Sequence, residues 1–333
     1  MSDAPACSVV LPTHNPDSIR LQRTLGALRE QTVPSATWEL IVVDNASDPP
    51  LAGRIDLAWH PAARVVHEQK LGLTSARLRG FAEAAGELLL LVDDDNMLAP
   101  DYLAQLTARF AAEPALGALG GRSRPEFEQS PPAWTRAFDG LLALRDLGDI
   151  SLRAAWRGNG PREYPCCAPI GAGMALRREG AAAYAAALAR DPRRRSLDRR
   201  GNQLVSGGDN DLVMTILDAG SDVVYDPALT LTHLIPAQRS SRDYLGRLNR
   251  AIARSWVNVL ALHGIRPWPQ LARGTVPLRC CRSWWRTRAW RGPTQWVRWQ
   301  GRCGQFEGQA DLRASDDPPM SPPVRARTGE GQG

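Results

Sequence analysis

Short apolar runs and longer amphipathic stretches alternate along the first hundred residues of the chain. The apolar runs cover residues 7–11, 38–43, 63–67 and 88–92. We expect each run to form a strand, and the five consecutive aliphatic residues of 88–92 to be buried on both faces. Helices are predicted at 17–31 and 75–85. This alternation predicts a parallel sheet with right-handed crossovers.

The pattern is weaker in the rest of the chain. Helices are expected at 100–113, 209–220 and 242–263, and strands at 116–122 and 223–225. Residues 123–165 are rich in Arg, Pro and Gly, which predicts irregular structure or short helices, and 193–200 is a basic loop. The first strand is expected to end at Pro12, which donates no hydrogen bond.

Size and charge favour one large α/β domain with appendages, or two small domains. The 333 residues carry a formal charge of +6, and residues 266–333 hold twelve arginines against five acidic residues, so the basic character belongs to the tail. The six cysteines fit no zinc or disulfide spacing, which indicates reduced thiols. We see no signal-peptide pattern and no run of about 18 apolar residues, and expect a cytoplasmic protein.

Three consecutive carboxylates, Asp93, Asp94 and Asp95, follow the buried run 88–92. Adjacent anions repel, so such a cluster needs a cation beside it. Carboxylate oxygens favour Mg²⁺ or Mn²⁺, which also bind substrate phosphates. Ligands of open α/β sheets bind beyond the carboxyl ends of the strands, where this cluster lies. The cluster therefore predicts a divalent-cation site, although a solvated acidic turn after a core strand would have the same sequence pattern.

Other strand ends add polar residues to the same edge. Thr13 and Asn15 follow the first run, and Asp44 follows the second. Since the carboxyl ends of parallel strands meet at one edge, these side chains predict the lip of a pocket. The first turn has no Gly-x-Gly-x-x-Gly sequence, which argues against a dinucleotide-binding site.

Local sequence leaves the later candidates open. Gly171 and Gly173 allow either a close backbone approach to a ligand or a tight bend. Asp209 and Asp211 open a predicted helix, where acidic residues are also favoured as caps. His233 lies in an apolar stretch, where a histidine is commonly a core residue rather than a metal ligand.

Six segments, taken together, resemble the family 2 glycosyltransferases of the GT-A fold. In chain order they are 8–15 (SVVLPTHN), 39–47 (ELIVVDNAS), 72–77 (GLTSAR), 92–96 (VDDDN), 171–177 (GAGMALR) and 208–212 (GDNDL). Each segment alone is weak evidence for this family, but six segments in the family's order are specific evidence. They span residues 7 to about 235. The resemblance implies a GT-A-type α/β fold with a mostly parallel central sheet flanked by helices, followed here by a helical, basic extension.

The resemblance also implies an inverting, metal-dependent transfer from a nucleoside-diphosphate sugar, with roles for individual residues. Those implied to bind the nucleotide sugar are Pro12, Thr13, Asn15, Asp44, Arg77, Asp93 and Asp94. Asp95 and His233 would hold Mg²⁺ or Mn²⁺ on the diphosphate. Asp209 would be the general base, while Gly173 and Asp211 would contact the acceptor.

A domain division follows from the same resemblance. The catalytic domain would cover 1–235, with a nucleotide-binding half at about 7–122 and an acceptor half at about 123–235. Beyond it we expect a C-terminal helix at 236–265, an Arg/Trp-rich extension at 266–307 and a disordered tail at 308–333, which is rich in Gly, Pro, Ser and charge.

Two departures from the family pattern keep other functions open. Gly208 stands where a glutamate usually precedes the base, and Leu78 stands where an asparagine usually follows the arginine. An inactive, membrane-docked scaffold is therefore one alternative. A sugar-phosphate nucleotidyltransferase is another, although 12–15 is not the Gly-rich phosphate loop of that class.

Residues 279–302 interleave Arg with Trp, which is typical of segments at anionic membrane surfaces. Many acceptors of such enzymes are lipid-linked glycans, so we predict a glycan or lipid-linked acceptor and membrane-surface contact through 279–302, on the inner face of the cell membrane. A helix packed on the catalytic domain would have the same composition. Nucleic acid is not an expected partner, since the main domain is near neutral.

Overall fold

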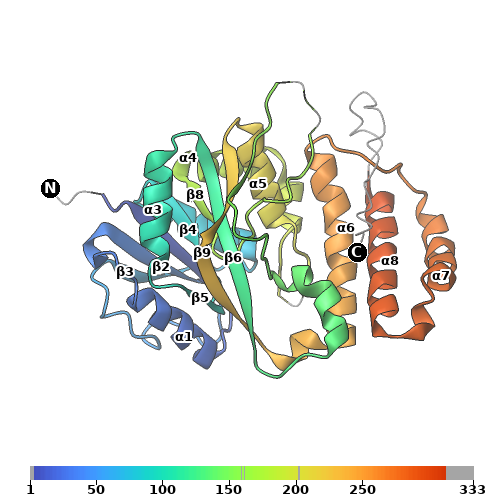
Figure 1. Cartoon of the computed structure of the whole chain (residues 1–333), viewed down its shortest axis with the longest axis horizontal. Coiled ribbons are helices and arrows are strands. Elements are labelled where there is room, and N and C mark those ends of the chain that lie inside the picture. Colours follow the sequence, from blue (N-terminus) through green and yellow to red (C-terminus); the bar gives the residue numbers. More distant parts are fainter. Residues whose placement is uncertain (1–3, 159, 161, 202, 313–333) are drawn as a thin grey trace.

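The computed structural model describes residues 4–158, 160, 162–201 and 203–312, which form one mixed sheet with helices on both faces and three further helices side by side (Figure 1). The strands are β1 (Cys7–Thr13), β2 (Trp38–Asp44), β3 (Ala63–His67), β4 (Leu88–Leu91), β5 (Asn96–Leu98), β6 (Leu116–Phe127), β7 (Leu152–Ala154), β8 (Ala175–Arg177) and β9 (Asp222–Ile235). The α-helices are α1 (Ser18–Arg29), α2 (Leu73–Glu83), α3 (Tyr102–Ala112), α4 (Arg178–Arg190), α5 (Gly208–Asp218), α6 (Arg242–Leu262), α7 (Val276–Thr287) and α8 (Pro293–Asp311). The longer 3₁₀ segments are η2 (Ala133–Leu142) and η3 (Pro192–Ser196).

The sheet confirms the parallel order expected for the first half of the chain. Its strand order is β3-β2-β1-β4-β8-β6-β9-β5, with β7 beside β9. The first four strands are parallel, and β6 and β9 form a second long parallel pair. The short strands β5, β7 and β8 are antiparallel to their neighbours. The central sheet is thus mostly parallel, as the GT-A class requires.

Alternate residues of the central strands pack into two cores. On β1, Val9 and Leu11 contact α1 and α3, whereas Val10 faces α2, α4 and α5. On β4, Leu88 and Leu90 share the first core, and Leu89 and Leu91 share the second. Both faces of these strands are therefore buried, as the uninterrupted apolar run 88–92 predicts.

The prediction that the first strand ends at Pro12 is wrong, because β1 continues to Thr13. Val10 accepts a hydrogen bond from Val92 on the β4 side, and Thr13 accepts one from Asn45 on the β2 side. Pro12 therefore turns its nitrogen toward β4, which has already ended at Leu91. No ladder hydrogen bond is lost there, so the proline is tolerated.

Other differences lie where the sequence pattern was weak. β6 runs on to Phe127 and β7 adds 152–154, so part of 123–165 is strand rather than irregular structure. β9 is one strand across both apolar stretches near 223–235, and α4 follows β8 where no helix was predicted. Disorder from residue 308 is wrong for 308–311, which complete α8; residues 313–333 lie outside the described part of the chain.

The C-terminal helices α8 and α6 pack closely through glycines of α8. A carbon atom added at Gly308 would lie 2.7 Å from the carbonyl oxygen of Arg254, and one added at Gly304 would lie still closer to the carbonyl oxygen of Arg250 on the neighbouring turn. Ion pairs from Arg250 to Glu307 and from Arg254 to Asp311 flank this contact. The α8 part of the basic extension is therefore packed on the rest of the protein, while α7 lies at the outer edge (Figure 1).

Candidate functional site

A pocket of about 470 Å³ lies at the carboxyl ends of β1 and β4. Its walls combine strand ends, the start of α2, the loop between η3 and α5, η2 and one face of α6. The acidic residues and arginines that line it are Arg77, Asp93, Asp94, Asp95, Arg145, Asp198, Arg199, Asp209 and Arg239, and its two histidines are His14 and His233. The sheet edge predicted to bind ligand is therefore the edge that carries the pocket.

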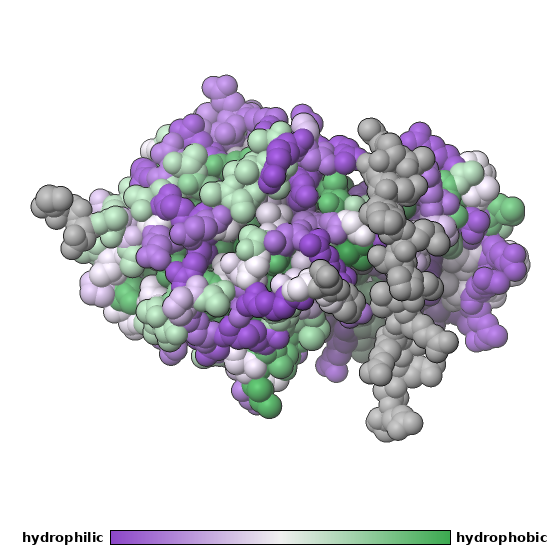
Figure 2. Space-filling model, turned by 90° about the horizontal axis from the view of Figure 1, so that it is seen from above, coloured by the Kyte–Doolittle hydropathy of each residue, from purple (hydrophilic) through white to green (hydrophobic). Residues whose placement is uncertain are grey.

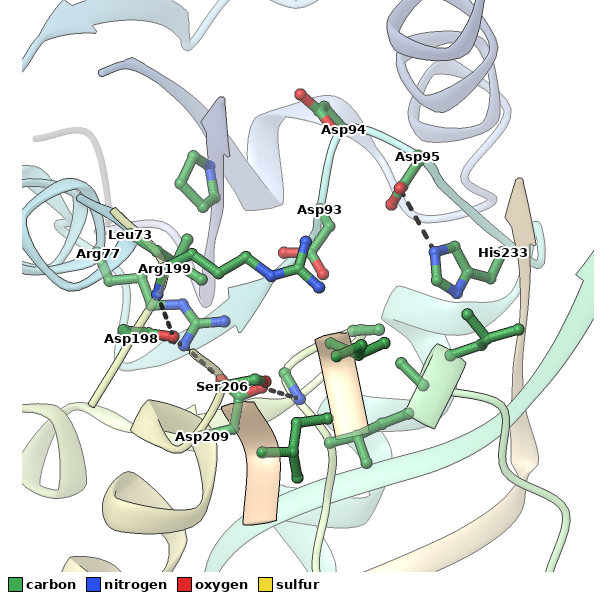
Figure 3. Close-up of a pocket in the computed structure, with 18 of the residues that line it drawn as sticks. Leu73, Arg77, Asp93, Asp94, Asp95, Asp198, Arg199, Ser206, Asp209 and His233 are labelled. Atoms are coloured by element: carbon green, nitrogen blue, oxygen red, sulfur yellow. Dashed lines mark hydrogen bonds and ion pairs between the residues drawn. The ribbon is translucent and has the colours of Figure 1, made fainter. Parts of the chain in front are cut away.

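The three consecutive aspartates have different surroundings. The hydroxyl of Thr13 donates a hydrogen bond to Asp94. Burial and the adjacent Asp95 nevertheless raise the pKa of Asp94 to about 7. Burial also raises the pKa of Asp93, which Arg77 partly opposes. Figure 3 shows Arg199 reaching across the pocket toward Asp93. The cluster is thus short of positive charge on its Asp93–Asp94 side.

Asp95 has two neighbours that carry nitrogen donors, His233 and Arg239. Its Oδ2 lies 3.4 Å from Nε2 of His233 and 3.0 Å from a guanidinium nitrogen of Arg239. That same nitrogen lies 3.3 Å from Nε2 of His233. Burial favours the neutral acid, but His233 and Arg239 outweigh it and hold the pKa of Asp95 well below its usual range. Asp95 is therefore held as an anion.

The donor atoms beside Asp95 fit a divalent cation that substrate oxygens would complete. One carboxylate oxygen and one imidazole nitrogen face a common point, and Arg239 now places a positive charge there. The part of the chain that the structure describes contains no group of three His, Cys, Asp or Glu side chains that could hold a metal alone. Two protein donors plus phosphate oxygens is a usual arrangement for Mg²⁺. Asp95 and His233 would be the two donors.

On the opposite wall, Asp209 opens α5 and points into the pocket (Figure 3). Its Oδ1 accepts a hydrogen bond from Arg77, and its Oδ2 accepts one of 3.1 Å from the backbone N–H of Gly171. A carbon atom at Gly171 would lie 2.6 Å from the carboxyl carbon of Asp209. The sequence left two expectations open for these glycines, a close approach to a ligand or a tight bend; at Gly171 the backbone closely approaches a protein carboxylate.

Arg77 is a buried cation among three carboxylates. Besides Asp209, it contacts Asp198 at 3.4 Å, and its side chain is 3% exposed. Burial opposes the charge of Arg77, but Asp209, Asp198 and Asp93 together raise its pKa above the usual value. Arg77 is therefore held as a permanent charge between the two walls.

Some residues expected in the nucleotide site organise its edge instead. Pro12 and Thr13 line the pocket, whereas Asn15 and Asp44 do not. Asn15 joins two loops, since its N–H donates to Ser47 and its side-chain oxygen accepts from Asp48. Asp44 is buried and accepts from the backbone N–H groups of Ser47 and Leu51. These bonds outweigh burial and lower the pKa of Asp44.

The placements of Asp211 and Gly173 do not fit the expected acceptor-binding role. The Asp211 side chain is fully buried and faces Arg194 and His263, 2.8 Å from the latter. Gly173 has a left-handed backbone (φ 75°), and its carbonyl accepts a hydrogen bond from Tyr102. A side chain there would collide with Tyr102 and Leu231. Both residues support the fold behind the pocket.

Besides Arg145, sequence reasoning missed three charged pocket residues: Asp198, Arg199 and Arg239. The first two come from the loop predicted only as basic, and the third lies six residues beyond His233. No periodicity marks them, since all lie outside regular elements or at their ends. Their signal was composition alone: charged residues in irregular segments of an otherwise well-ordered chain.

Comparison with known protein families gives one match. The model for "Glycosyl transferase family 2" matches residues 8–178, just over half of the chain. The matched segment includes Arg77 and Asp93–Asp95 but ends before Asp198 and Asp209.

Individual relatives are similar over shorter segments. Validoxylamine A glucosyltransferase of Streptomyces hygroscopicus subsp. limoneus is 33% identical over 124 residues, which is 36% of this chain and 27% of that protein. Glycosyltransferase AglE of Haloferax volcanii is 29% identical over 97 residues, 28% of this chain and 32% of AglE. The matches thus span no more than about a third of these relatives.

A solved structure shares the fold. The crystal structure of GalNAc-T7 with UDP, GalNAc and Mn²⁺ aligns with a TM-score of 0.50 and 18% identity, over 78% of this chain and 51% of that one. At this identity the likeness concerns the fold alone.

Proposed function

The chain belongs to glycosyl transferase family 2, and we propose that it transfers a sugar from a nucleoside-diphosphate sugar to a hydroxyl group of a glycan or lipid-linked glycan, with inversion at the anomeric carbon. One observation carries the proposal. A carboxylate suited to a base, Asp209, faces the acidic cluster Asp93–Asp95 across one pocket, and the cations Arg77, Arg199 and Arg239 lie around it. A diphosphate and a sugar need both features within one site.

In this mechanism, the donor lies along the sheet edge and the acceptor enters toward α6. Asp209 accepts the proton of the acceptor hydroxyl while its oxygen attacks the anomeric carbon. The bond from that carbon to the diphosphate oxygen breaks in the same step, so the configuration inverts and a nucleoside diphosphate leaves. Arg199 and Arg239 oppose the negative charge that develops on the leaving group.

A divalent cation held by Asp95 and His233 would add Lewis-acid stabilisation of the leaving diphosphate. Arg239 would then lie next to the phosphates rather than between the two ligands. GalNAc-T7, which shares the fold, was solved with Mn²⁺. We propose the same class of ion for this chain, either Mg²⁺ or Mn²⁺.

An assay of nucleoside-diphosphate release tests the proposal. Purified protein is incubated with UDP-, GDP- and dTDP-sugars and Mn²⁺ or Mg²⁺, with and without chelator. We expect metal-dependent release from one donor class, and Asp95→Ala is expected to lower it by at least about 10²-fold, since it removes charge stabilisation of the leaving group. Thermal stabilisation by each donor is read in the same plate, because turnover without acceptor is slow.

Asp101→Ala is the matched control, since Asp101 is exposed and lies outside the pocket. Its release rate should equal that of the unmodified protein. Failure to bind or cleave any of these donors in the presence of metal would leave the inactive scaffold as the better interpretation. Synthesis of a nucleotide sugar from a sugar phosphate and a nucleoside triphosphate would instead favour the nucleotidyltransferase.

We further propose that α7 contacts an anionic membrane surface. Residues 244–306 contain twelve arginines and no acidic residue. Leu278, Trp285 and Trp290 are 74%, 66% and 51% exposed, and the rings of the two tryptophans lie 5.1 Å apart. Apolar and strongly polar side chains gather at this end of the molecule (Figure 2). The arginines on and beside α7 are Arg279, Arg282, Arg286, Arg288 and Arg291.

The charge of this surface is uncompensated within the described residues, where none of these five arginines forms an ion pair. Each arginine near an anionic membrane would contribute about 1 kcal/mol to the free energy of binding. Tryptophan side chains favour the headgroup boundary. None of the helices described is both long and apolar enough to span a bilayer.

Vesicle sedimentation tests the membrane proposal. We expect binding to vesicles that contain phosphatidylglycerol, little binding to phosphatidylcholine alone, and weakening by salt. Trp285→Ser with Trp290→Ser should reduce binding severalfold. Ile150→Ser removes an equally exposed apolar side chain away from α7 and should not. If the unmodified protein stays in the supernatant with anionic vesicles at low salt, α7 does not bind membranes.

A further inference from the structure

Gly208, the first residue of α5, leaves room for a carboxylate from another part of the chain. A carbon atom at the Cβ position of Gly208 would lie 2.6 Å from the carboxyl carbon of Asp198, closer than real Cβ atoms approach. The backbone of Gly208 is not in the left-handed region, so its conformation does not require glycine. Glycine costs about 1 kcal/mol relative to alanine within a helix. Its presence here is explained by the space that Asp198 fills.

Asp198 shares its cation with Asp209. A single guanidinium nitrogen of Arg77 contacts Oδ2 of Asp198 at 3.4 Å and also donates to Oδ1 of Asp209. Asp198 is further held by the hydroxyl of Thr74 at 3.3 Å. The side chain of Asp198 is 4% exposed and that of Asp209 is 27% exposed. Asp198 therefore lies behind the guanidinium and Asp209 lies in front of it, facing the pocket (Figure 3).

Asp198 and Asp209 compete for the charge of one guanidinium. A carboxylate paired alone with a guanidinium is a weaker base, because the pair favours the charged form. A second anion on the same guanidinium opposes this effect. Burial raises the pKa of Asp198 to about 6, Arg77 lowers it, and Asp209 raises it again, as expected when two carboxylates compete for one cation.

We propose that Asp198 is a positioning residue for Asp209. It holds Arg77 from the side away from the pocket, so that Arg77 and the N–H of Gly171 together orient the Asp209 carboxylate. The acidic group missing at position 208 is thereby supplied from the loop after η3. This inference rests on the proposed function only in treating Asp209 as the base.

Kinetics of Asp198→Asn test the role. Asparagine keeps the size of the side chain and removes its charge. We expect kcat to fall about 10- to 100-fold, as for other partners that orient a functional group from behind, while KM for the donor stays within about threefold. Asp101→Asn, which makes the same change at an exposed residue outside the pocket, should change neither value. Unchanged kcat in Asp198→Asn, or a loss confined to KM, would overturn the proposal.

A second pair of variants moves the carboxylate back to α5. Gly208→Glu alone is expected to be nearly inactive and destabilised, because the new side chain collides with Asp198. With Asp198→Ala added, the collision is removed and a carboxylate again stands beside Arg77. The double variant should exceed both single variants in kcat by at least about tenfold. Equal or lower activity in the double variant would contradict the assigned role.

Stability separates this inference from the proposed function. Gly208→Ala should lower the free energy of unfolding when Asp198 is present, and have little effect in the Asp198→Ala background, whether or not any donor is turned over. If the protein is inactive but its unfolding free energies show this coupling, the proposed function is refuted and the contact between Asp198 and Gly208 is supported. An active protein without it would refute the placement of Asp198 against Gly208.

Discussion

Asp209→Asn lowers kcat for sugar transfer by about 10²- to 10⁴-fold and leaves donor affinity nearly unchanged: this is the largest kinetic effect that we expect. Asparagine has the shape of aspartate and still accepts a hydrogen bond, but it cannot take the acceptor proton. Asp209 lies on the wall opposite the acidic cluster, so the donor site is untouched. Rates of transfer and donor binding by calorimetry, measured with the same preparation, separate the two effects.

Glu179→Gln is the matched control, because it makes the same chemical change at an exposed position on α4. Its kcat should equal that of the unmodified protein. If Asp209→Asn keeps kcat within about threefold, another group accepts the proton, and the role of Asp209 is limited to its ion pair with Arg77.

Arg77→Met is expected to have the largest effect on stability, about 3–5 kcal/mol of the free energy of unfolding. Methionine preserves much of the volume but leaves Asp198 and Asp209 without their shared cation. The loss should depend on pH. Arg77 lowers the pKa of Asp198 and of Asp93, so without it both values rise further. In the variant, the folded form then binds protons more tightly than the unfolded form, and stability recovers as pH falls through the further raised pKa of Asp198, which lies above its value of about 6 in the unmodified protein.

Urea unfolding at pH 8 and at pH 5 measures this prediction. The deficit of Arg77→Met should be clearly larger at the higher pH. Arg79→Met serves as control, since Arg79 lies on the same helix and makes only an exposed ion pair with Glu83, worth about 0.3–0.5 kcal/mol. The same deficit at both pH values would mean that packing, rather than charge, is what Arg77 contributes.

The sheet could be predicted from sequence because its central strands are uniformly apolar. Residues 88–91 pack between helices on both faces of the sheet. Such a short run of four buried leucines is typical of a strand that is covered on both faces. Helix α4 was not predicted, since alanines occupy both its buried positions, such as Ala181 and Ala187, and its exposed ones, such as Ala182. Alanine favours a helix but gives little contrast between faces, so a reading based on hydrophobic periodicity has nothing to detect there.

Only some residues of the site could be predicted from sequence. Asp93–Asp95 and Thr13 were predictable because strand ends of a parallel sheet converge. Asp211 was predicted to contact the acceptor, but its side chain is buried behind the pocket. Residues two apart on a helix point in nearly opposite directions, so Asp209 and Asp211 cannot both face one pocket. Asp198 and Arg239 belong to segments without a period. Only packing, such as the contact between Asp198 and Gly208, assigns them to the site.

One face of helix α6 lines the pocket, and another face packs against α8. Tyr244, Leu248 and Ile252 line the pocket at intervals of four residues, while Arg250 and Arg254 lie against the glycines of α8. The helix also lies beyond the segment that the family model matches. For enzyme engineering, α6 and α8 are therefore a single exchangeable unit: grafted together from a relative, they would reshape one wall of the pocket and keep their own mutual fit, while the carboxylates on the sheet edge stay in place.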